Sequence, residues 1–401
     1  MSVTQTWSLD DFISGEQIRR LRLPANEAEG LPGRVYADPA FFELERRQLF
    51  PRGWMAIAFE SDVPEPGDAV PIEIAGWNFI VARNRNGDVK VFHNICRHRT
   101  MTVLREPCTK AQTLQCGWHG WTYDLNGRLI ATPDLGGMDE ATGKTSAEQP
   151  GIEKAGLGLR EVRSETWMHF IFVNIDGQAE PFGTFIQPVL DRIPDHDLSQ
   201  VKFSGLTTQA QFDGNWKLAM ETGCEDYHLP WVHPQVGPRS GVFRGERGGN
   251  TYVSIASRRA PSGDGRTSAN LRRFPHLEGF DDSDGLGPEI ILFFIVPNAI
   301  ISFLHDHVVT NIYNPVTHDR TPSRRAFHFL GDNATDPRLQ GVREGVRDAW
   351  VALGEQDFPL VREVQSKQAQ RDELGLETRF SAYWESAVHH FQNVVVDRLT
   401  A

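Results

Sequence analysis

The chain has 401 residues, of which 39% are hydrophobic and 23% charged, as in an ordinary globular protein. This length is sufficient for two domains with separate hydrophobic cores. A formal net charge of -12 argues against a nucleic-acid-binding protein, which normally carries a basic face, and favours small molecules and proteins as partners.

The cysteine content and the N-terminal sequence bear on the cellular location. Only 4 cysteines occur, and Cys108 and Cys224 are the two that lie outside the motif described below, so no disulfide framework is expected. The first residues, Met1 to Trp7, have neither the basic nor the apolar region of a signal peptide, and no later apolar run approaches a membrane span. We therefore expect a cytoplasmic protein without a membrane segment.

The N-terminal region predicts two helical pieces. Within residues 1–35, which are mostly polar, Leu9, Phe12 and Ile13 suggest one short amphipathic helix. Asp38-Pro39 then provides a helix start, and the apolar residues that follow have roughly helical spacing and stop before Pro51. We expect this second helix to pack against the larger domain.

From Trp54 the sequence changes to short alternating apolar runs separated by Pro-Gly and Asn-Gly pairs. This pattern predicts a small antiparallel β domain that ends near residue 160. Asn86-Gly87 and Asn126-Gly127 predict type I′ hairpin turns. The Gly- and Thr-rich segment 133–150 is expected to be a surface loop.

A metal-ligating motif lies within this β domain. Cys96-Arg97-His98 is followed, after seventeen residues, by Cys116-Gly117-Trp118-His119. Two thiolates and two imidazoles form the mixed set that holds a [2Fe-2S] cluster with both histidines on one iron. A structural zinc site is the alternative, although zinc fingers usually pair Cys with Cys and His with His.

The motif and the Gly120-Trp121-Thr122-Tyr123 sequence after it resemble the Rieske domain of Rieske non-haem iron oxygenases. This resemblance implies that Cys96, His98, Cys116 and His119 ligate the [2Fe-2S] cluster. The neighbouring Arg97, Arg99 and Arg105 are either a docking patch for an acidic electron donor or solvated loop residues.

Beyond the β domain, strands and helices alternate less regularly. Residues 167–174 and 203–212 each predict a strand, 290–316 returns to strand-like alternation, and 336–371 has helical periodicity. The segment 237–287 is rich in Gly, Arg and Ser and lacks periodicity, so it predicts a long loop, which is usually functional or mobile.

A second constellation begins at Asn215-Trp216-Lys217, which opens a predicted helix. This helix would deliver Glu225 and His228 on one face, because they are three residues apart. His233 is five residues after His228, about 140° around an ideal helix, so the two histidines converge only if the helix stops or distorts. Pro230 offers the cause. Two histidines and a carboxylate form the facial triad of non-haem Fe(II) oxygenases, whereas two histidines alone are also common in surface loops.

The sequence Glu-Asp-Tyr-His-x-x-x-x-His resembles the mononuclear iron motif of the same oxygenases. The resemblance implies that His228 and His233 are iron ligands. It also implies that Glu225 bridges the two metal centres across a subunit boundary, accepting a hydrogen bond from His119 of a neighbouring subunit and orienting His228.

The third iron ligand has to come from another part of the chain. Glu355-Gln356-Asp357 and the sequence up to Gln365 resemble the family's acidic helix, in which an Asp lies eight residues before a Gln. The resemblance therefore implies Asp357 as the ligand, with Glu355 as its nearest rival. The simpler interpretation of Asp357 is an exposed acid on a helix.

The resemblance covers about residues 35–395 and implies an α+β fold. It implies an N-terminal helical segment over residues 1–50, a Rieske [2Fe-2S] domain over 51–163, and a mononuclear iron catalytic domain over 164–401. The catalytic domain would have a helix-grip architecture with a central antiparallel sheet. A homotrimer is also implied, since a bridge such as Glu225 is needed only if the two centres meet between chains.

The expected activity is that of a Rieske-type monooxygenase or dioxygenase with O₂ as co-substrate. No convincing Gly-rich dinucleotide motif occurs, so NAD(P)H and flavin are expected in a separate reductase. Glu225 and the segments 306–310 and 355–365 look most like the choline, carnitine, glycine betaine and stachydrine monooxygenases. That branch implies hydroxylation of an N-methyl group, which leads to demethylation.

The substrate contacts are the least defined part of this hypothesis. Trp231, Phe303 and Tyr313 are candidates to bind an ammonium group by cation-π contact, and His307 to line or support the pocket. Hydroxylation of an aromatic acid is the enzymatic alternative, with Arg258, Arg272 or Arg273 as carboxylate partner. An iron-sulfur electron carrier or structural metal protein is the non-enzymatic alternative, but it would need only the first motif.

Overall fold

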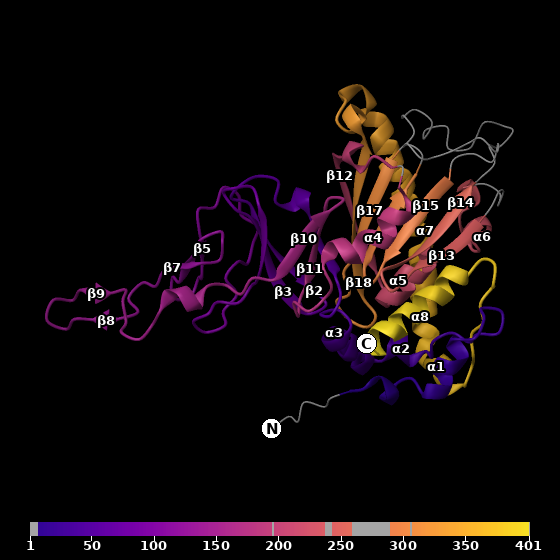
Figure 1. Cartoon of the computed structure of the whole chain (residues 1–401), viewed down its shortest axis with the longest axis horizontal. Helices are drawn as coiled ribbons and strands as arrows, with labels where there is room; N and C mark the ends of the chain where they lie inside the picture. The colour runs from indigo at the N-terminus through magenta and orange to yellow at the C-terminus, as the bar shows by residue number, and fades with distance from the viewer. Residues whose placement is uncertain (1–6, 195, 237–242, 259–288, 305–306, 401) are drawn as a thin grey trace. The chain divides into compact units, whose positions relative to one another are not determined.

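The computed structural model describes residues 7–194, 196–236, 243–258, 289–304 and 307–400 (Figure 1). The chain divides into two compact units. The larger unit comprises Met1–Met55 and Ala179–Ala401, and the smaller unit comprises Ala56–Gln178. Among the described residues, no helix has the length and apolar character needed to cross a membrane.

The smaller unit is built from short antiparallel sheets around a core that includes Phe92, Trp121 and Tyr123. One sheet has the order β1-β11-β10, one β2-β3-β4, one β5-β6-β7, and β8 pairs with β9. The strands are β1 (Met55–Phe59), β2 (Ala69–Ile74), β3 (Trp77–Arg83), β4 (Val89–His93), β5 (Leu114–Gln115), β6 (Thr122–Tyr123), β7 (Leu129–Ala131), β8 (Gly137–Met138), β9 (Thr145–Ser146), β10 (Arg163–Trp167) and β11 (Phe170–Asn174). The short 3-10 helices η2 (Glu60–Asp62) and η3 (Lys154–Leu157) complete the unit.

The two Asn-Gly pairs form turns, but the predicted type I′ geometry is wrong. Only the glycines have positive φ, 89° at Gly87 and 78° at Gly127, whereas type I′ requires positive φ at both central residues. The Gly87 N–H donates to the Asn84 carbonyl at 3.1 Å, which is a type I turn followed by a left-handed glycine. The side chains of Asn84 and Asp124 each accept the backbone N–H two residues on, which stabilises this alternative turn.

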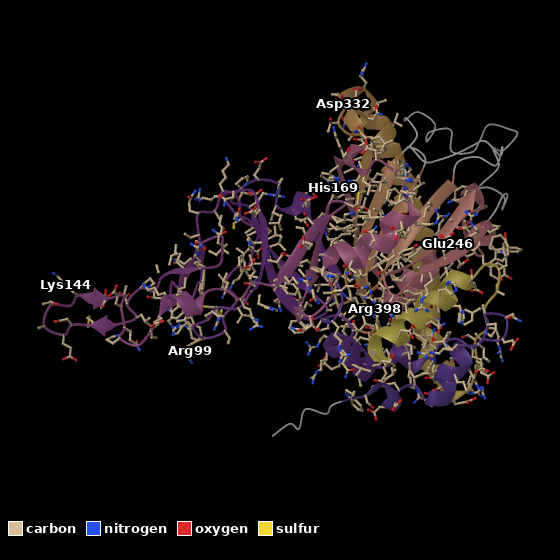
Figure 2. All side chains as sticks on the ribbon, viewed as in Figure 1. Arg99, Lys144, His169, Glu246, Asp332 and Arg398 are labelled. Carbon is tan, nitrogen blue, oxygen red and sulfur yellow. The ribbon has the colours of Figure 1, made fainter. Side chains whose placement is uncertain are left out.

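Residues 167–174 are not one strand as predicted. β10 ends at Trp167 and β11 begins at Phe170, so Met168 and His169 form a two-residue hairpin loop, in which His169 is labelled in Figure 2. Both have positive φ, 47° and 64°, as a type I′ turn requires. The turn was missed because neither residue belongs to the types that normally mark such turns.

The larger unit contains a seven-stranded antiparallel sheet of order β12-β18-β17-β16-β15-β14-β13, which confirms the predicted α+β fold with a central antiparallel sheet. Its strands are β12 (Val201–Phe212), β13 (Phe243–Gly248), β14 (Tyr252–Arg258), β15 (Glu289–Ile295), β16 (Ala299–Phe303), β17 (His307–Tyr313) and β18 (Thr321–Leu330). The predicted loop over 237–287 is wrong for 243–258, which form β13 and β14, while 237–242 and 259–288 lie outside the described residues. The edge strand β13 was missed because its Gly- and Arg-rich sequence shows little apolar alternation.

The larger unit also contains α-helices and short 3-10 helices. They are η1 (Leu9–Asp11), α1 (Gly15–Leu21), α2 (Arg34–Ala37), α3 (Pro39–Gln48), α4 (Phe182–Arg192), η4 (Leu198–Gln200), α5 (Trp216–Gly223), α6 (Leu229–Val232), η5 (Pro234–Val236), η7 (Gly331–Ala334), η8 (Pro337–Leu339), α7 (Gln340–Glu373) and α8 (Ser386–Thr400). α3 starts as predicted, because the Asp38 side chain accepts the Ala40 N–H at 2.8 Å. The single helix expected near Leu9 is instead the 3-10 turn η1 followed by α1.

The long helix α7 packs along one face of the sheet. Phe358 on α7 contacts Phe212 on β12 with ring centroids 4.9 Å apart, and the Trp350 indole donates to His307 on β17 at 3.0 Å. Val346 joins a buried cluster with residues of β17 and β18. These contacts hold the middle of α7 against the sheet.

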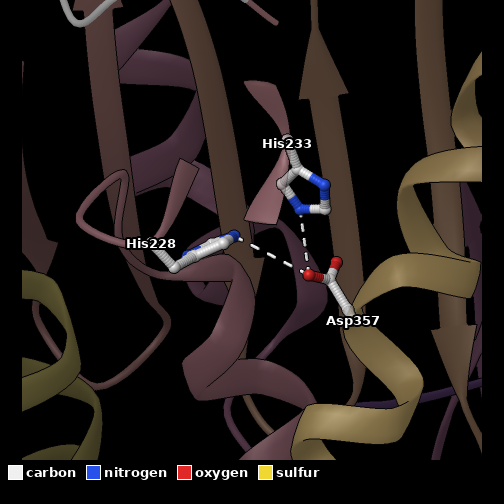
Figure 3. Close-up of side chains that lie close together, drawn as sticks. All are labelled: His228, His233 and Asp357. Atoms are coloured by element: carbon white, nitrogen blue, oxygen red, sulfur yellow. Dashed lines mark ion pairs between the residues drawn. The ribbon is translucent and has the colours of Figure 1, made fainter. Parts of the chain in front are cut away.

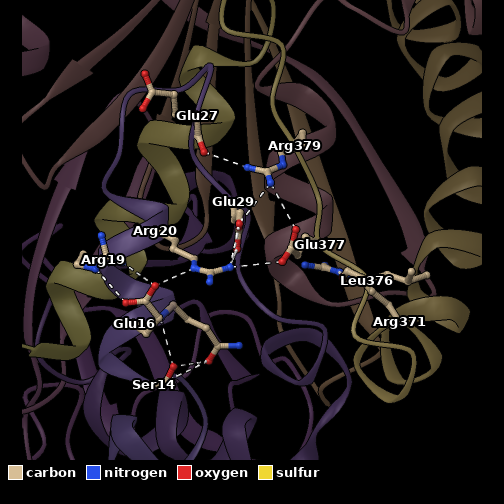
Figure 4. A network of polar contacts seen from close by, with 11 residues as sticks. Ser14, Glu16, Arg19, Arg20, Glu27, Glu29, Arg371, Leu376, Glu377 and Arg379 are labelled. Atoms are coloured by element: carbon tan, nitrogen blue, oxygen red, sulfur yellow. Dashed lines mark hydrogen bonds and ion pairs between the residues drawn. The ribbon is translucent and has the colours of Figure 1, made fainter.

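The C-terminal end of α7 is attached to the N-terminal segment by polar contacts, some of which are drawn in Figure 4. Arg371 donates to the backbone carbonyls of Leu31 and Leu376 at 2.6 and 3.1 Å. Asp372 accepts the backbone N–H groups of Gly33 and Arg34, each at 2.6 Å. The carboxylate-arginine pairs in the same figure are mostly exposed and contribute little each, so the backbone contacts of Arg371 and Asp372 are the firmer attachment.

Candidate functional site

The predicted continuous helix carrying Glu225 and His228 is wrong. α5 begins after Asn215, whose side chain accepts the Lys217 N–H at 3.0 Å, and it ends at Gly223. Glu225 lies in the connection, and His228 caps the next short helix, α6. Pro230 therefore does not break a helix but occupies the first turn of α6, where a missing N–H costs nothing.

Glu225 fixes the orientation of His228. One carboxylate oxygen, Oε2, accepts the backbone N–H of His228 at 3.0 Å, and Oε1 lies 2.5 Å from its Nδ1. A carboxylate can only accept here, so Nδ1 carries the hydrogen and the Nε2 lone pair is left available. Burial lowers the pKa of His228, but the hydrogen bond and charge of Glu225 outweigh it, and the net shift is upward.

His233 is held in the same way by a neutral partner. Its Nδ1 lies 2.7 Å from Oε1 of Gln356, an oxygen that also accepts from Nε2 of Gln235 at 2.6 Å. The amide oxygen is an acceptor, so Nδ1 of His233 is again the donor and Nε2 again carries the free lone pair. The His233 side chain is buried, with 2% of its surface exposed.

The two free Nε2 atoms converge on Asp357, as Figure 3 shows. Asp357 Oδ1 lies 2.9 Å from Nε2 of His233 and 3.8 Å from Nε2 of His228. One ligand atom from each of the three residues lies within 4.8 Å of the others. Asp357 Oδ1 is buried and accepts no hydrogen bond from either ring.

This arrangement fits a metal ion. Three lone pairs that face one another without a hydrogen between them repel, and a cation at their centre removes the repulsion. Two histidines and one carboxylate, with further positions open, are the donor set of non-haem Fe(II) sites. Burial raises the pKa of Asp357, while His233 and His228 lower it. The rival acid Glu355 is exposed, so the structure brings Asp357 and not Glu355 to the histidines.

The first motif forms a second convergent set, in the smaller unit. Nδ1 of His98 and Nδ1 of His119 lie 3.1 Å apart, and the His98 ring stacks on Trp121 at 4.9 Å. Cys96 and Cys116 are buried, whereas His119 is exposed. Burial raises the pKa of Cys116, and its backbone hydrogen-bond donors oppose this effect. Buried thiols and more accessible imidazoles, with His98 half-buried and His119 exposed, suit a cluster with one inner and one outer iron.

The two ligand loops have the same backbone design. In each, the Cys N–H donates to the carbonyl five residues later, at 2.7 Å for Cys96 and 2.8 Å for Cys116. In each, the residue four positions after the Cys donates back to the Cys carbonyl and has positive φ, 57° at Thr100 and 69° at Gly120. The Tyr123 hydroxyl lies 3.3 Å from Cys96 Sγ and accepts the Arg97 N–H at 3.0 Å, which holds the first loop from behind.

Two family profiles match regions of the chain that contain these two groups of residues. The Rieske [2Fe-2S] domain profile matches residues 53–142, and the profile of the ring-hydroxylating α-subunit catalytic domain matches residues 200–401. The chain belongs to the ring-hydroxylating α-subunit family of Rieske oxygenases. Members of this family are monooxygenases and dioxygenases, and their cofactors are a Rieske [2Fe-2S] cluster and mononuclear non-haem iron.

Relatives within the Rieske oxygenases differ in substrate. The chain is 30% identical to the biphenyl dioxygenase α subunit of Metapseudomonas furukawaii over 55% of this chain and 52% of that protein. It is 29% identical to the glycine betaine monooxygenase oxygenase subunit of Chromohalobacter salexigens over 51% and 43% of the two chains. The chain thus spans about half the length of these relatives. A solved quaternary ammonium Rieske monooxygenase has the same fold, with a TM-score of 0.76 at 17% identity over 95% of this chain and 98% of that one.

The predicted substrate-contact residues of this oxygenase are not brought together. Trp231 is 85% exposed on α6. His307 and Tyr313 lie on the same face of β17, which α7 covers, and both are buried. Phe303 pairs with Val308 in the sheet, so it projects from the opposite face, where it contacts Phe293.

The predicted carboxylate partners cannot be placed. Arg272 and Arg273 lie outside the described residues, and the side chain of Arg258 does too. Among residues that the sequence interpretation did not assign, Gln356 is the clearest functional one. Its position beside Asp357 in the sequence did not indicate that it would accept a hydrogen bond from His233, because a Gln in a helix is normally a solvent-exposed residue.

Proposed function

We propose that the chain is the oxygenase component of a multicomponent Rieske system, which hydroxylates a small substrate with O₂ and electrons from a separate reductase. The observation that carries this proposal is the convergence of His228 Nε2, His233 Nε2 and Asp357 Oδ1 in the catalytic domain of an α subunit. These residues would hold iron, which supplies O₂ activation, and Cys96, His98, Cys116 and His119 would hold the cluster, which supplies electrons.

The surrounding residues keep the iron ligands in their reactive form. Glu225 and Gln356 accept the Nδ1–H groups of the two histidines, so the Nε2 atom of each ring is the one left to bind a metal. Acceptors of this kind raise ligand basicity and fix ring orientation. Asp357 on α7 is held against the sheet by Phe358 next to it.

Glu225 is also the proposed bridge to the cluster of a second copy, within a homotrimer. On the larger unit, Tyr227, Trp231 and Tyr383 are large exposed aromatic side chains, with 46%, 85% and 55% of their surfaces accessible. On the smaller unit, Trp118 beside His119 is 51% exposed. Exposed aromatic residues of this kind are typical of protein interfaces and support docking between copies.

The bridge is tested with Glu225→Gln. The amide keeps the shape and one acceptor but loses the charge, so we expect both metals to remain bound while reoxidation of the reduced cluster in a single turnover slows about 10- to 100-fold. The neighbouring Asp226→Asn, which removes a carboxylate of the same loop, is the matched control and should change little. An unchanged rate in Glu225→Gln with full metal content would eliminate the bridge.

The proposed reaction is hydroxylation of an N-methyl group of a quaternary or tertiary amine. The similarity to a glycine betaine monooxygenase supports it. Ring hydroxylation of an aromatic acid is the second candidate, supported by the similarity to a biphenyl dioxygenase. The two are separated by measuring O₂ uptake with a generic reductase and NADH over methylated ammonium compounds and aromatic acids. Formaldehyde equal to O₂ consumed supports demethylation, whereas uptake without formaldehyde supports ring hydroxylation.

The same preparation tests the alternative of an electron carrier without oxygenase activity. Chelation that removes the mononuclear iron but keeps the visible spectrum of the cluster should abolish O₂ uptake, and adding Fe(II) should restore it. If substrate-dependent uptake persists without that iron, the oxygenase proposal is wrong.

A further inference from the structure

Arg325 on β18 is an unusual arginine in the larger unit. It pairs with Asn311 of β17 in the sheet register, so the two side chains project from the same face. On β17, residues alternate, and Asn311 lies between His307 and Tyr313 on that face. His307 contacts Trp350 of α7, so Arg325 projects from the face that α7 covers.

The contacts of Arg325 do not neutralise its charge. Its Nη1 donates to the Trp350 carbonyl at 2.9 Å, and its guanidinium carbon lies 5.2 Å from the centre of the Trp350 ring. Among the residues that the structure describes, no carboxylate lies within the 4 Å of an ion pair with Arg325, whereas Arg192 and Arg247 of the same unit are paired with Glu246 and Asp397. A guanidinium has five N–H donors, and the protein occupies one with a hydrogen bond.

The surroundings of Arg325 connect it to the metal-ligand group. Trp350, whose carbonyl accepts from Arg325, precedes Asp357 by seven residues, which is about two turns along the same face of α7. In agreement with this placement, burial lowers the pKa of Arg325, and Tyr313 and Asp357 raise it. Arg325 nevertheless keeps part of its surface accessible.

Asn311, which lies next to Arg325 in the sheet, has one side-chain atom without a hydrogen-bond partner among the described residues. Asn311 is only 4% exposed, and its Oδ1 atom is buried without a hydrogen-bond partner. A buried amide that leaves one end unpaired costs free energy unless a ligand or water satisfies it. The open Oδ1 atom of Asn311 is an acceptor and suits a hydroxyl or N–H of a ligand, whereas the N–H donors of Arg325 suit an acid group.

We infer that Arg325 binds the carboxylate of the substrate, while the other end of the substrate reaches His228, His233 and Asp357. The inference rests on the proposed oxygenase function and names the substrate class as small carboxylic acids. Both candidate reactions include such molecules, as betaines and as aromatic acids. Neutral hydrocarbons and cationic amines without an acid group would be rejected, because they leave the guanidinium unpaired.

The test compares each acid with its neutral amide, so that only the charge differs. Binding of benzoate and benzamide, and of glycine betaine and its amide, is measured by calorimetry on the protein loaded with cluster and iron. In the unmodified protein at least one acid should bind more tightly than its amide. Arg325→Gln should weaken that acid about 10- to 100-fold, as expected for a hydrogen bond to a charged group, and leave the amide unchanged. Arg325→Lys should recover part of the affinity, since it keeps the charge but not the bidentate geometry.

Arg324→Gln is the matched control, because the side chain of this neighbour projects from the other face of the sheet. The thermal midpoint and cluster absorbance identify any variant that fails to fold. The inference is overturned if no acid is preferred over its amide, or if Arg325→Gln folds and keeps the preference. O₂ uptake is measured separately. If acid binding depends on Arg325 but no acid gives O₂ uptake, the carboxylate site is supported and the oxygenase proposal is refuted.

Discussion

Replacing Lys217 with Met tests how the polypeptide that leads into the metal-ligand loop is held. Lys217 lies in the first turn of α5, and its Nζ is 2.6 Å from Oε1 of Glu45 on α3, with both side chains fully buried. Oε2 of Glu45 accepts the Trp216 indole N–H at 3.1 Å. The pair therefore joins α5 to α3 inside the core.

The magnitude follows from this geometry. With an effective dielectric constant of about 20, two charges at this distance attract by roughly 6 kcal/mol. Burial opposes this attraction: it raises the pKa of Glu45 and lowers that of Lys217. Removing one partner of such a pair leaves the other charge buried alone, which costs about 3–5 kcal/mol. At about 2 °C per kcal/mol for a unit of this size, Lys217→Met should lower the thermal midpoint by roughly 6–10 °C.

The assay is thermal unfolding of the metal-loaded protein, followed by near-ultraviolet circular dichroism. The double variant Glu45→Gln with Lys217→Met removes both charges and keeps an acceptor for Trp216, so most of the lost stability should return. Two results would show that the ion pair does not stabilise the attachment of α5 to α3. One is a thermal midpoint of Lys217→Met within about 2 °C of that of the unmodified protein, and the other is a double variant that is less stable than the single one.

Three further predictions concern the metal-ligand group and its surroundings. Asp357→Asn should lose mononuclear iron, measured by metal analysis, while the cluster absorbance stays and the exposed Glu355→Gln keeps both. Gln356→Leu, which removes the acceptor for His233 Nδ1, should lower iron affinity about 10- to 100-fold, measured by competition with a chelator. Burial raises the pKa of Glu221 from 4.5 to about 7 against the opposing Tyr36 hydrogen bond and Lys217 charge. The folded state then holds the proton more tightly, so the contribution of Glu221 to stability is fully present below pH 4.5 and is lost as the pH rises through about 7. Glu221→Gln should remove this loss, so its thermal midpoint should match the unmodified protein at low pH and exceed it at pH 8.

Local sequence was sufficient to select the candidate ligands that lie close together in the chain. The Cys-x-His and Cys-x-x-His pairs each lie within one tight loop, so their spacing alone predicts that the ligand atoms of a pair converge. Asp357 is different, because it follows His233 by more than one hundred residues. Only the resemblance to a known family could place it, since no periodicity in the sequence connects α6 with α7.

Predictions of the backbone conformation failed where side-chain hydrogen bonds or the sheet overrode the conformation that the local sequence favours. Glu225 and His228 are spaced for one helix, yet Gly223 ends α5 and Glu225 binds the backbone of His228 instead. The Asn-Gly turns were assigned the wrong type because the side chains of Asn84 and Asp124 hold a different turn. These errors involve short-range hydrogen bonds of Asn, Asp and Glu side chains, which compete with the regular backbone pattern.

Arg325 could not have been selected from the sequence, because Arg324 beside it is equally basic and only strand register decides which one faces α7. Once β17 and β18 are paired, that choice follows from alternation alone. The same register places Asn311 opposite Arg325, with Tyr313 two residues further along β17. Arg325 and Asn311 can therefore be substituted without altering the proposed iron ligands, which come from α7, from α6 and from its flanking loop. Such a separation would allow related chains to retain one iron-binding arrangement while they differ in the acids, amines or hydrocarbons they accept.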